Sequence, residues 1–167
     1  MFNIEIVKHG QTPDYTLSEI IRLKSLAWNY SLEKQMLWIS EHISESDMHC
    51  LLSENGINVA YLNLIDLKIY IDRVCYDAYG IGNVCSAVRG KGYGTTLMNF
   101  VNHYIIEKQR IGILLCKIQL VNFYNRSNWL LVPHSKLQCD FDLANIEMMI
   151  YNYKSSYQEV RYIGSSF

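Results

Sequence analysis

The most informative stretch of the sequence is Val84-Cys85-Ser86-Ala87-Val88-Arg89-Gly90-Lys91-Gly92-Tyr93-Gly94, which a helical pattern follows directly from Thr95. An apolar run ends in this stretch, three glycines alternate with other residues, and two cations stand beside them. Because glycine lacks a Cβ atom, the backbone N–H groups of such a loop can converge on one anion, and the start of a helix adds partial positive charge. The stretch therefore predicts a phosphate-binding loop in which Arg89 and Lys91 neutralise the remaining negative charge.

Two common nucleotide-binding motifs do not fit this loop. The dinucleotide motif G-x-G-x-x-G needs two residues before its last glycine, and only one is present; the P-loop needs Ser or Thr after its lysine, and Gly92 follows Lys91. The pattern V-x-x-x-x-R-G-x-G-x-G instead resembles the pyrophosphate loop of the GCN5-related N-acetyltransferases, which hold acetyl-CoA. The match runs from Val84, at the end of a predicted strand, through every position of the loop.

A second segment, 120–129, supports the same resemblance. It is similar to the family's N-x-F-Y-x-x-x-G-F helix, in which Asn122 stands at the asparagine position and Tyr124 at the tyrosine position. Asn128 stands where the family has the glycine that ends the helix in a left-handed conformation, and asparagine is the next residue able to adopt it. Trp129 stands where the family has the phenylalanine of this motif, and it supplies an aromatic anchor of similar role.

The resemblance implies the α/β acyl-CoA N-acyltransferase fold: a central mixed, mostly antiparallel sheet with one splayed parallel strand pair and helices on both faces. It implies a single domain over residues 1–167, with a cofactor-binding half at about 81–129. The strand before the loop and its hairpin partner also resemble, more weakly, the aminoglycoside 2′-N-acetyltransferases.

Hydrophobic periodicity predicts the same order of elements. Strands are predicted over 2–7, 48–52, 59–71, 73–85, 111–118, 130–132 and 146–153, and helices over 18–29, 32–42, 92–109 and 120–128. Glu54-Asn55-Gly56 is typical of a hairpin turn. The apolar strand Met148–Tyr151 could be an exposed edge, and the tail 157–167 could order against a partner or fray.

The family's mechanism is direct attack of an amine on the acetyl thioester, and the resemblance assigns roles to individual residues. Backbone groups of Val84 and Ser86 bind pantetheine, Asn122 binds the same arm, and the N–H of Val84 or Cys85 is the oxyanion donor. Tyr124 is the general acid that protonates the leaving thiolate. The pyrophosphate is expected on the N–H groups of Arg89, Gly90, Lys91, Gly92, Tyr93, Gly94 and Thr95.

The general base does not follow from the sequence, because Gly80 stands where many relatives have glutamate. Asp77 is nearby but offset, and we interpret it as a solvated strand residue. A base acting through water, or an amine that arrives neutral, would need no carboxylate here. Cys85 is interpreted as a small buried residue rather than a nucleophile.

The aromatic residues of the N-terminal helices, Trp28, Tyr30 and Trp38, are open to two interpretations. They lie in the region that usually forms the family's acceptor site, where they could stack on a sugar or an amine. Packing in the core is the other interpretation.

Composition excludes several classes of protein. Half of the 167 residues are hydrophobic, 19% are charged, and the net charge is −1 with no basic block, so a nucleic-acid partner is not expected. The five cysteines include no C-x-x-C pair and indicate free thiols in a reducing compartment. The histidines are scattered, so no metal site is expected. With no signal peptide and no membrane-spanning run, we expect a cytoplasmic protein without a membrane partner.

The sequence therefore predicts an acetyl-CoA-dependent N-acetyltransferase that acts on a primary amine of a small molecule, with no metal. The missing glutamate leaves open a non-catalytic acyl-CoA-binding sensor or scaffold. A longer acyl donor, a protein amine as acceptor, and a homodimer also remain open.

Overall fold

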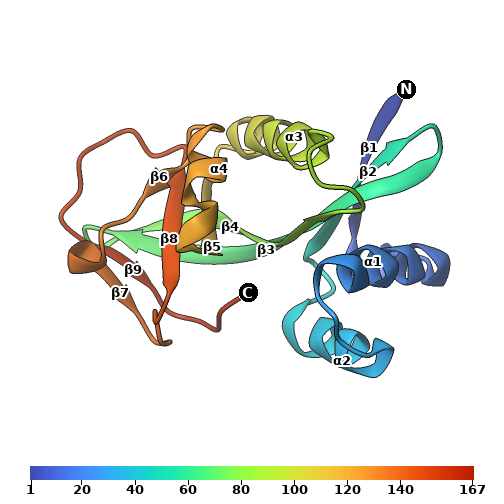
Figure 1. Ribbon diagram of the computed structural model, residues 1–167. Helices are drawn as coiled ribbons and strands as arrows, with labels where there is room; N and C mark the ends of the chain where they lie inside the picture. Colours follow the sequence, from blue (N-terminus) through green and yellow to red (C-terminus); the bar gives the residue numbers. More distant parts are fainter. The chain divides into compact units, whose positions relative to one another are not determined.

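The computed structural model describes residues 1–167 and divides into two compact units (Figure 1). The first unit comprises Met1–Ile65 and Gly82–Met98, and the second comprises Asp66–Ile81 and Asn99–Phe167. The predicted cofactor-binding half, 81–129, contributes residues to both units.

Three antiparallel strands and two helices make up most of the first unit. Its strand order is β1-β2-β3-β4, with β1–β2 and β2–β3 antiparallel. The elements are β1 (Phe2–Lys8), the short helix η1 (His9–Gln11), α1 (Asp14–Ala27), α2 (Leu32–His42), β2 (Met48–Glu54), and parts of β3 (Ile57–Ile71), β4 (Val74–Ser86) and α3 (Tyr93–Glu107). The predicted bounds of α2 are confirmed, and Ser31 caps this helix by accepting a hydrogen bond from the Lys34 N–H.

The hairpin between β2 and β3 forms as predicted. Asn55 (φ 51°) and Gly56 (φ 82°) both adopt the positive φ angles that a two-residue hairpin turn of type I′ requires. Helix α1 packs on this antiparallel sheet through a buried cluster of Ile20, Leu23, Leu51, Tyr61 and Cys85.

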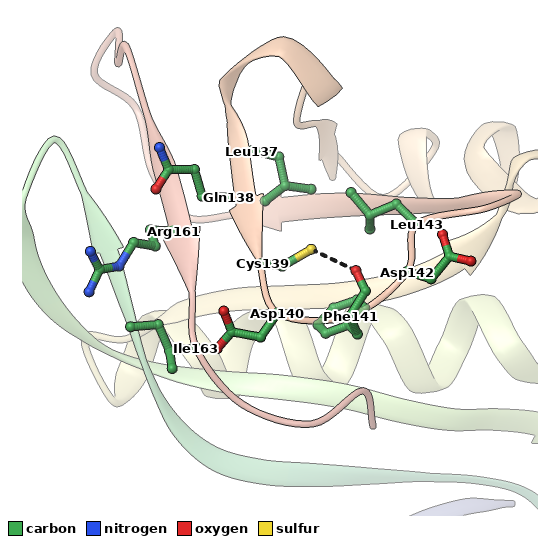
Figure 2. Close-up of a pocket in the computed structure, with 9 residues that line it drawn as sticks. All are labelled: Leu137, Gln138, Cys139, Asp140, Phe141, Asp142, Leu143, Arg161 and Ile163. Atoms are coloured by element: carbon green, nitrogen blue, oxygen red, sulfur yellow. Dashed lines mark hydrogen bonds between the residues drawn. The ribbon is translucent and has the colours of Figure 1, made fainter.

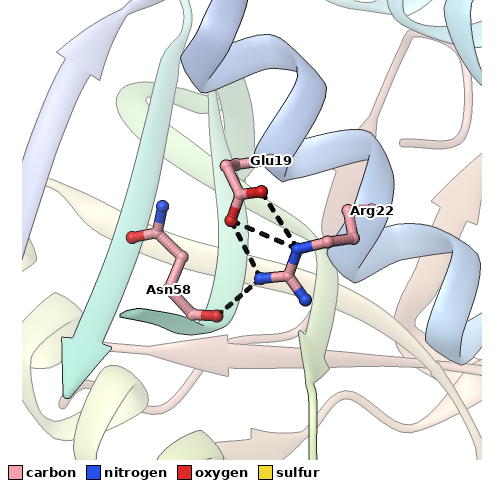
Figure 3. Close-up of polar contacts among 3 residues, drawn as sticks. All are labelled: Glu19, Arg22 and Asn58. Atoms are coloured by element: carbon pink, nitrogen blue, oxygen red, sulfur yellow. Dashed lines mark hydrogen bonds and ion pairs between the residues drawn. The ribbon is translucent and has the colours of Figure 1, made fainter. Parts of the chain in front are cut away.

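An exposed polar clamp also joins α1 to β3 (Figure 3). Arg22 forms an ion pair with Glu19 at 2.9 Å, and its Nη2 donates to the Asn58 carbonyl at 2.9 Å. Because the pair is exposed, its contribution to stability is small.

The second unit contains the parallel pair. Its strand order is β3-β4-β5-β8-β6, and β9 pairs with β3 and β7. The further elements are β5 (Ile111–Lys117), η2 (Ile118–Leu120), α4 (Val121–Asn125), β6 (Leu130–Leu131), η3 (His134–Lys136), β7 (Leu137–Cys139), β8 (Ile146–Tyr151) and β9 (Val160–Tyr162).

The predicted parallel pair is confirmed between β4 and β5. Its ladder runs from Ala78↔Ile111 to Ile81↔Leu114 and ends there, although β4 continues to Ser86 and β5 to Lys117. The sheet is therefore mixed, as the predicted fold class requires. A second, short parallel ladder joins β7 to β9, and the sequence had not indicated it.

The structure corrects two predictions for the C-terminal region. Strand β8 is not an edge, because it pairs with β5 on one side and with β6 on the other. The tail does not fray: β9 lies against β3 of the same chain, and the Asp72 carboxylate accepts hydrogen bonds from the Gln158 and Glu159 N–H groups at 2.8 and 2.9 Å.

The segment after α4 is held by a buried tryptophan. Asn128 has φ 64°, which confirms the predicted left-handed helix end. Trp129 is completely buried, and its Nε1–H donates to Asn102 Oδ1 at 2.9 Å. Asn102 Nδ2 in turn donates to the Ser127 carbonyl at 2.9 Å.

We expect Asn102→Ala to lower the free energy of unfolding by about 3 kcal/mol, because it leaves the Trp129 N–H and the Ser127 carbonyl buried without partners. The change is measured by urea denaturation. Asn99→Ala, at an exposed position of the same helix, serves as the control and should change the midpoint little. Equal midpoints for the two variants would contradict the expected role of Asn102.

Candidate active site

The loop before α3 has the backbone geometry of an anion cradle. Gly90 (φ 79°) and Gly92 (φ 78°) both lie in the left-handed region that L side chains rarely adopt, and a Cβ atom built on either meets no atom within 4 Å. Within α3, the first intrahelical bond runs from the Thr96 N–H to the Gly92 carbonyl at 2.9 Å. The N–H groups before Thr96 precede the helix's own hydrogen-bond ladder, so they can donate to an anion.

The two cations of the loop are exposed. Arg89 and Lys91 form no ion pair within the chain, so their charges are not neutralised by carboxylates of the protein. Val84 and Ser86, at the end of β4, are half-buried. The loop therefore offers backbone donors and two unpaired positive charges on one short segment.

Tyr93 differs from the other loop residues because its side chain is buried. Its hydroxyl donates to Glu54 Oε2 at 2.6 Å, and its ring packs edge-on against Phe2 at 6.2 Å. The side chain thus anchors the start of α3 to β2 and β1. Only the backbone of Tyr93 remains for the role in cofactor binding that the sequence predicted.

Strand β4 is distorted just before Val84. Asn83 has φ 52° within the strand, an irregularity that the sequence did not reveal, and its Nδ2 donates to Asn63 Oδ1 at 2.7 Å. Two residues on, burial raises the pKa of Cys85 to about 12, so the thiol stays protonated at neutral pH. A protonated thiol is a poor nucleophile, which agrees with the interpretation of Cys85 as a buried small residue.

In the second unit, Tyr124 is a buried phenol on α4. Its ring lies 4.9 Å from that of Phe123, and its carbonyl accepts from the Ser127 N–H at 2.9 Å. Burial, with a smaller effect of Cys116, raises the pKa of Tyr124 above its ordinary value. The phenol therefore stays protonated at neutral pH and can act as a proton donor. Asn122, on the same helix, is exposed.

The structure supplies a physical reason for glycine at position 80. A Cβ atom there would lie 2.7 Å from Leu67 Cδ2 and 2.9 Å from the Phe167 ring, so both side chains would have to move. Asp77 is exposed and paired with Lys68 at 2.9 Å, and the hydrogen bond from Lys68 lowers the pKa of this carboxyl. Asp77 is thus a solvated, paired residue, as interpreted from the sequence.

The aromatic residues of the N-terminal helices separate in the structure. Trp28 packs against the buried cluster under α1, and Tyr30 is exposed. Trp38 stacks on His42 at 4.8 Å, and Lys24 Nζ lies 4.0 Å from the centroid of the Trp38 ring.

A group of buried polar residues in the first unit was missed at the sequence level. It includes Lys24, His49 and Asn63, next to the buried Tyr61, and also Thr16, Gln35 and Asp47. His49 Nδ1 is 2.8 Å from the Tyr61 hydroxyl, and His49 Nε2 is 2.9 Å from His9 Nδ1. The available signal was weak: His49 and Asn63 interrupt otherwise apolar strands.

An open pocket of about 660 Å³ lies in the second unit, between β7, the segment 140–143 and β9 (Figure 2). Within it, Cys139 Sγ donates to the Phe141 carbonyl at 3.4 Å. None of the residues predicted to bind acetyl-CoA lines this pocket.

All five cysteines are free, no group of three or more His, Cys, Asp and Glu side chains could hold a metal ion, and no helix is both long and apolar enough to span a membrane.

Comparison with known proteins places the fold. No protein-family profile and no curated protein match the sequence. Solved structures do: an acyl-CoA N-acyltransferase from Pseudomonas aeruginosa is 19% identical with a TM-score of 0.67, and Escherichia coli ElaA is 18% identical with a TM-score of 0.65. Each alignment covers 91% of this chain and 100% of the other.

A GNAT family acetyltransferase from Brucella melitensis, solved in complex with acetyl-CoA, is also similar. It is 16% identical with a TM-score of 0.58, and the alignment covers 96% of both chains. At these identities the likeness establishes the architecture. The chain therefore has the fold of the GCN5-related N-acetyltransferases.

Proposed function

We propose that this protein is an acetyl-CoA-dependent N-acetyltransferase that transfers the acetyl group to a primary amine of a small molecule. The observation that carries the proposal is the loop at the start of α3. Its two glycines have positive φ angles, nothing lies over them within 4 Å of a built Cβ, and its two cations are unpaired. A pyrophosphate is the anion that such a combination of N–H groups, helix start and cations suits.

The loop residues bind and orient the donor in this proposal. The N–H groups from Arg89 to Thr95 hold the pyrophosphate, and the Arg89 and Lys91 side chains neutralise it. Backbone groups of Val84 and Ser86 hold the pantetheine arm, and Asn122 adds a side-chain hydrogen bond to it. Holding the thioester in one orientation lowers the entropic part of the barrier to attack.

Two further groups act on the reacting atoms. The N–H of Val84 or Cys85 donates to the thioester oxygen as negative charge develops there. Tyr124 gives its phenolic proton to the leaving sulfur when the tetrahedral intermediate collapses. Its raised pKa keeps that proton in place at neutral pH. The proton that the amine nitrogen loses on becoming an amide passes to water, and the Tyr124 phenolate regains a proton from solvent after product release.

Calorimetric titration tests the proposal, with acetyl-CoA, free CoA and octanoyl-CoA as ligands. Preferential binding of acetyl-CoA, followed by thiol release with amino sugars, aminoglycosides, polyamines, amino acids or a peptide amine, is the expected result. No binding of any of the three would remove the loop from acyl-CoA recognition and overturn the proposal.

The same titration separates the alternatives. Binding of acetyl-CoA without turnover of any amine would favour an acyl-CoA sensor, for which the glycine at position 80 is the supporting observation. Tighter binding of octanoyl-CoA than of acetyl-CoA would favour a longer acyl donor.

A further inference from the structure

Asn83 has an unusual backbone conformation for a residue inside a strand. Its φ angle is 52°, although β4 continues on both sides of it, from Val74 to Ser86. The other residues that have a positive φ angle and are not glycine lie in turns or next to the ends of elements: Asn55, Asp72, Arg73, Gln109, Asn128, Asn145 and Asn152. A left-handed conformation is costly for an L residue, so it persists within a strand only where neighbouring groups hold it.

The side chain of Asn63, on β3, makes the contact that holds Asn83. Asn83 Nδ2 donates to Asn63 Oδ1 at 2.7 Å, and both residues belong to the first unit. The contribution of one such hydrogen bond is similar in size to the cost of one left-handed residue. The bond is therefore strong enough to decide which conformation Asn83 adopts.

Asn63 does not stabilise the fold at its own position. It is 0% exposed, it lies between the fully buried Leu62 and Leu64, and its Nδ2 has no hydrogen-bond partner. An apolar side chain of the same shape would leave no buried donor unsatisfied at this place. What the asparagine supplies is the acceptor for Asn83.

The conformation of Asn83 sets the direction of the peptide group that follows it. The N–H of Val84 belongs to that planar group, so its direction depends on the φ and ψ angles of Asn83. A left-handed residue within a strand breaks the regular alternation of N–H directions, as a β-bulge does, and turns backbone groups out of the ladder. The β4–β5 ladder has already ended at Ile81.

We infer that Asn63 is a positioning residue for acetyl transfer: its hydrogen bond to Asn83 holds the left-handed conformation that aims the Val84 N–H at the thioester oxygen. The inference rests on the proposed function, and it selects Val84 over Cys85 as the oxyanion donor. Asn63 is completely buried and acts through Asn83. Because hydrogen bonds weaken steeply when they are misaligned, loss of this contact would reduce stabilisation of the oxyanion.

The main test is Asn63→Leu, which keeps a branched side chain and removes the acceptor. We expect kcat for acetyl-CoA-dependent thiol release to fall by about 10- to 100-fold, which is less than the loss of a whole oxyanion donor. Acetyl-CoA affinity, measured by calorimetry, should change by less than about threefold, because the loop at the start of α3 is unaltered. A readout without turnover is the ligand-free crystal structure of this variant, which should show Asn83 with a negative φ angle.

A second substitution separates positioning from a purely structural role. Glycine adopts positive φ angles at no steric cost, so Asn63→Leu combined with Asn83→Gly should regain most of the lost kcat. A purely structural asparagine at position 63 would not be rescued in this way. If Asn63→Leu does not fold, single variants test the same claim with Asn63 in place: kcat of Asn83→Val should be at least about tenfold below that of Asn83→Gly, because β-branched residues avoid the left-handed region.

Asn152→Val is the matched control for Asn83→Val. Asn152 is also a half-buried asparagine, its φ angle is 63°, and its Nδ2 donates to the Arg110 carbonyl at 2.8 Å. The substitution removes the same kind of interaction next to the end of β8, so it should lower the thermal midpoint and leave kcat unchanged. Equal losses of kcat in the two valine variants would contradict the positioning role.

The remaining outcomes distinguish this inference from the proposed function. If the wild type released no thiol with any amine, the proposed function would fail and this inference with it. If the wild type were active, unchanged kcat in Asn63→Leu would overturn this inference alone. A loss of kcat that Asn83→Gly does not restore would also overturn it, because Asn63 would then act by some route other than the conformation of Asn83.

Discussion

Valine in place of Gly92 is expected to weaken acetyl-CoA binding by at least about 100-fold, the equivalent of losing one or two charge-assisted hydrogen bonds. Gly92 has φ 78°, a conformation that costs an L residue about 1–2 kcal/mol and a β-branched residue more. The loop would therefore change its conformation, so that its N–H groups no longer converge. The branched side chain would also occupy the open space over the loop. Calorimetric titration measures the loss.

Gly56→Val is the matched control for this variant. Gly56 has φ 82° and also has no atom within 4 Å of a built Cβ, so the substitution imposes a similar backbone strain at the β2–β3 hairpin. We expect it to lower the thermal midpoint and to leave acetyl-CoA affinity unchanged. Wild-type affinity in Gly92→Val, or equal losses in both variants, would separate the loop from cofactor binding.

Tyr124→Phe is expected to lower kcat by about 100-fold or more, which is the lower end of the rate factors that general acid catalysis contributes. The ring and its packing against Phe123 are kept, so acetyl-CoA affinity should change by less than about twofold. Steady-state kinetics and calorimetry measure the two quantities on the same protein. Because burial keeps the phenol protonated, the loss should be equally large throughout the neutral pH range.

Tyr162→Phe controls for the loss of a phenolic hydroxyl elsewhere in the second unit. Tyr162 is also buried, and its hydroxyl donates to the Ser165 carbonyl at 3.0 Å. The control should retain its turnover. An unchanged rate in Tyr124→Phe would end the role of Tyr124 as the acid.

Several features of the fold were predictable because neighbouring residues encode them. Asn55-Gly56 forms the predicted hairpin turn, and Asn128 ends its helix in the left-handed region. In each case the steric freedom of one or two residues selects the backbone conformation, whatever lies around them. The parallel β4–β5 pair was predictable for a related reason: a strand, a helix and a second strand in succession favour a parallel arrangement.

The misassigned elements depend on distant partners. Strand β9 is three residues long and carries no periodic signal, yet it pairs with β3, about ninety residues earlier in the chain. An apolar sequence such as that of β8 is compatible with both an edge strand and an inner strand of a sheet. Strand β8 is an inner strand because β6 pairs with the side that β5 leaves open. Neither pairing can be read from the local sequence.

The candidate site divides in the same way. The sequence by itself determined the cradle, because Gly90 and Gly92 carry their conformational freedom with them and the helix start follows from the pattern after them. Only the tertiary structure decided how the side chains near the loop are placed. The Tyr93 hydroxyl donates to Glu54, which buries that side chain, and at position 80 the Phe167 ring leaves no room for a Cβ atom.

The buried polar group of the first unit was decided by tertiary structure almost entirely. Lys24, His49 and Asn63 come from three different elements and carry no common spacing, so no motif connects them. Their unusual property is burial of polar groups, with Asn63 Nδ2 left without a hydrogen-bond partner, and burial is a consequence of packing between elements that are distant in the sequence. A backbone conformation is encoded by the residue that adopts it, whereas the environment of a charge is created by every element that surrounds it.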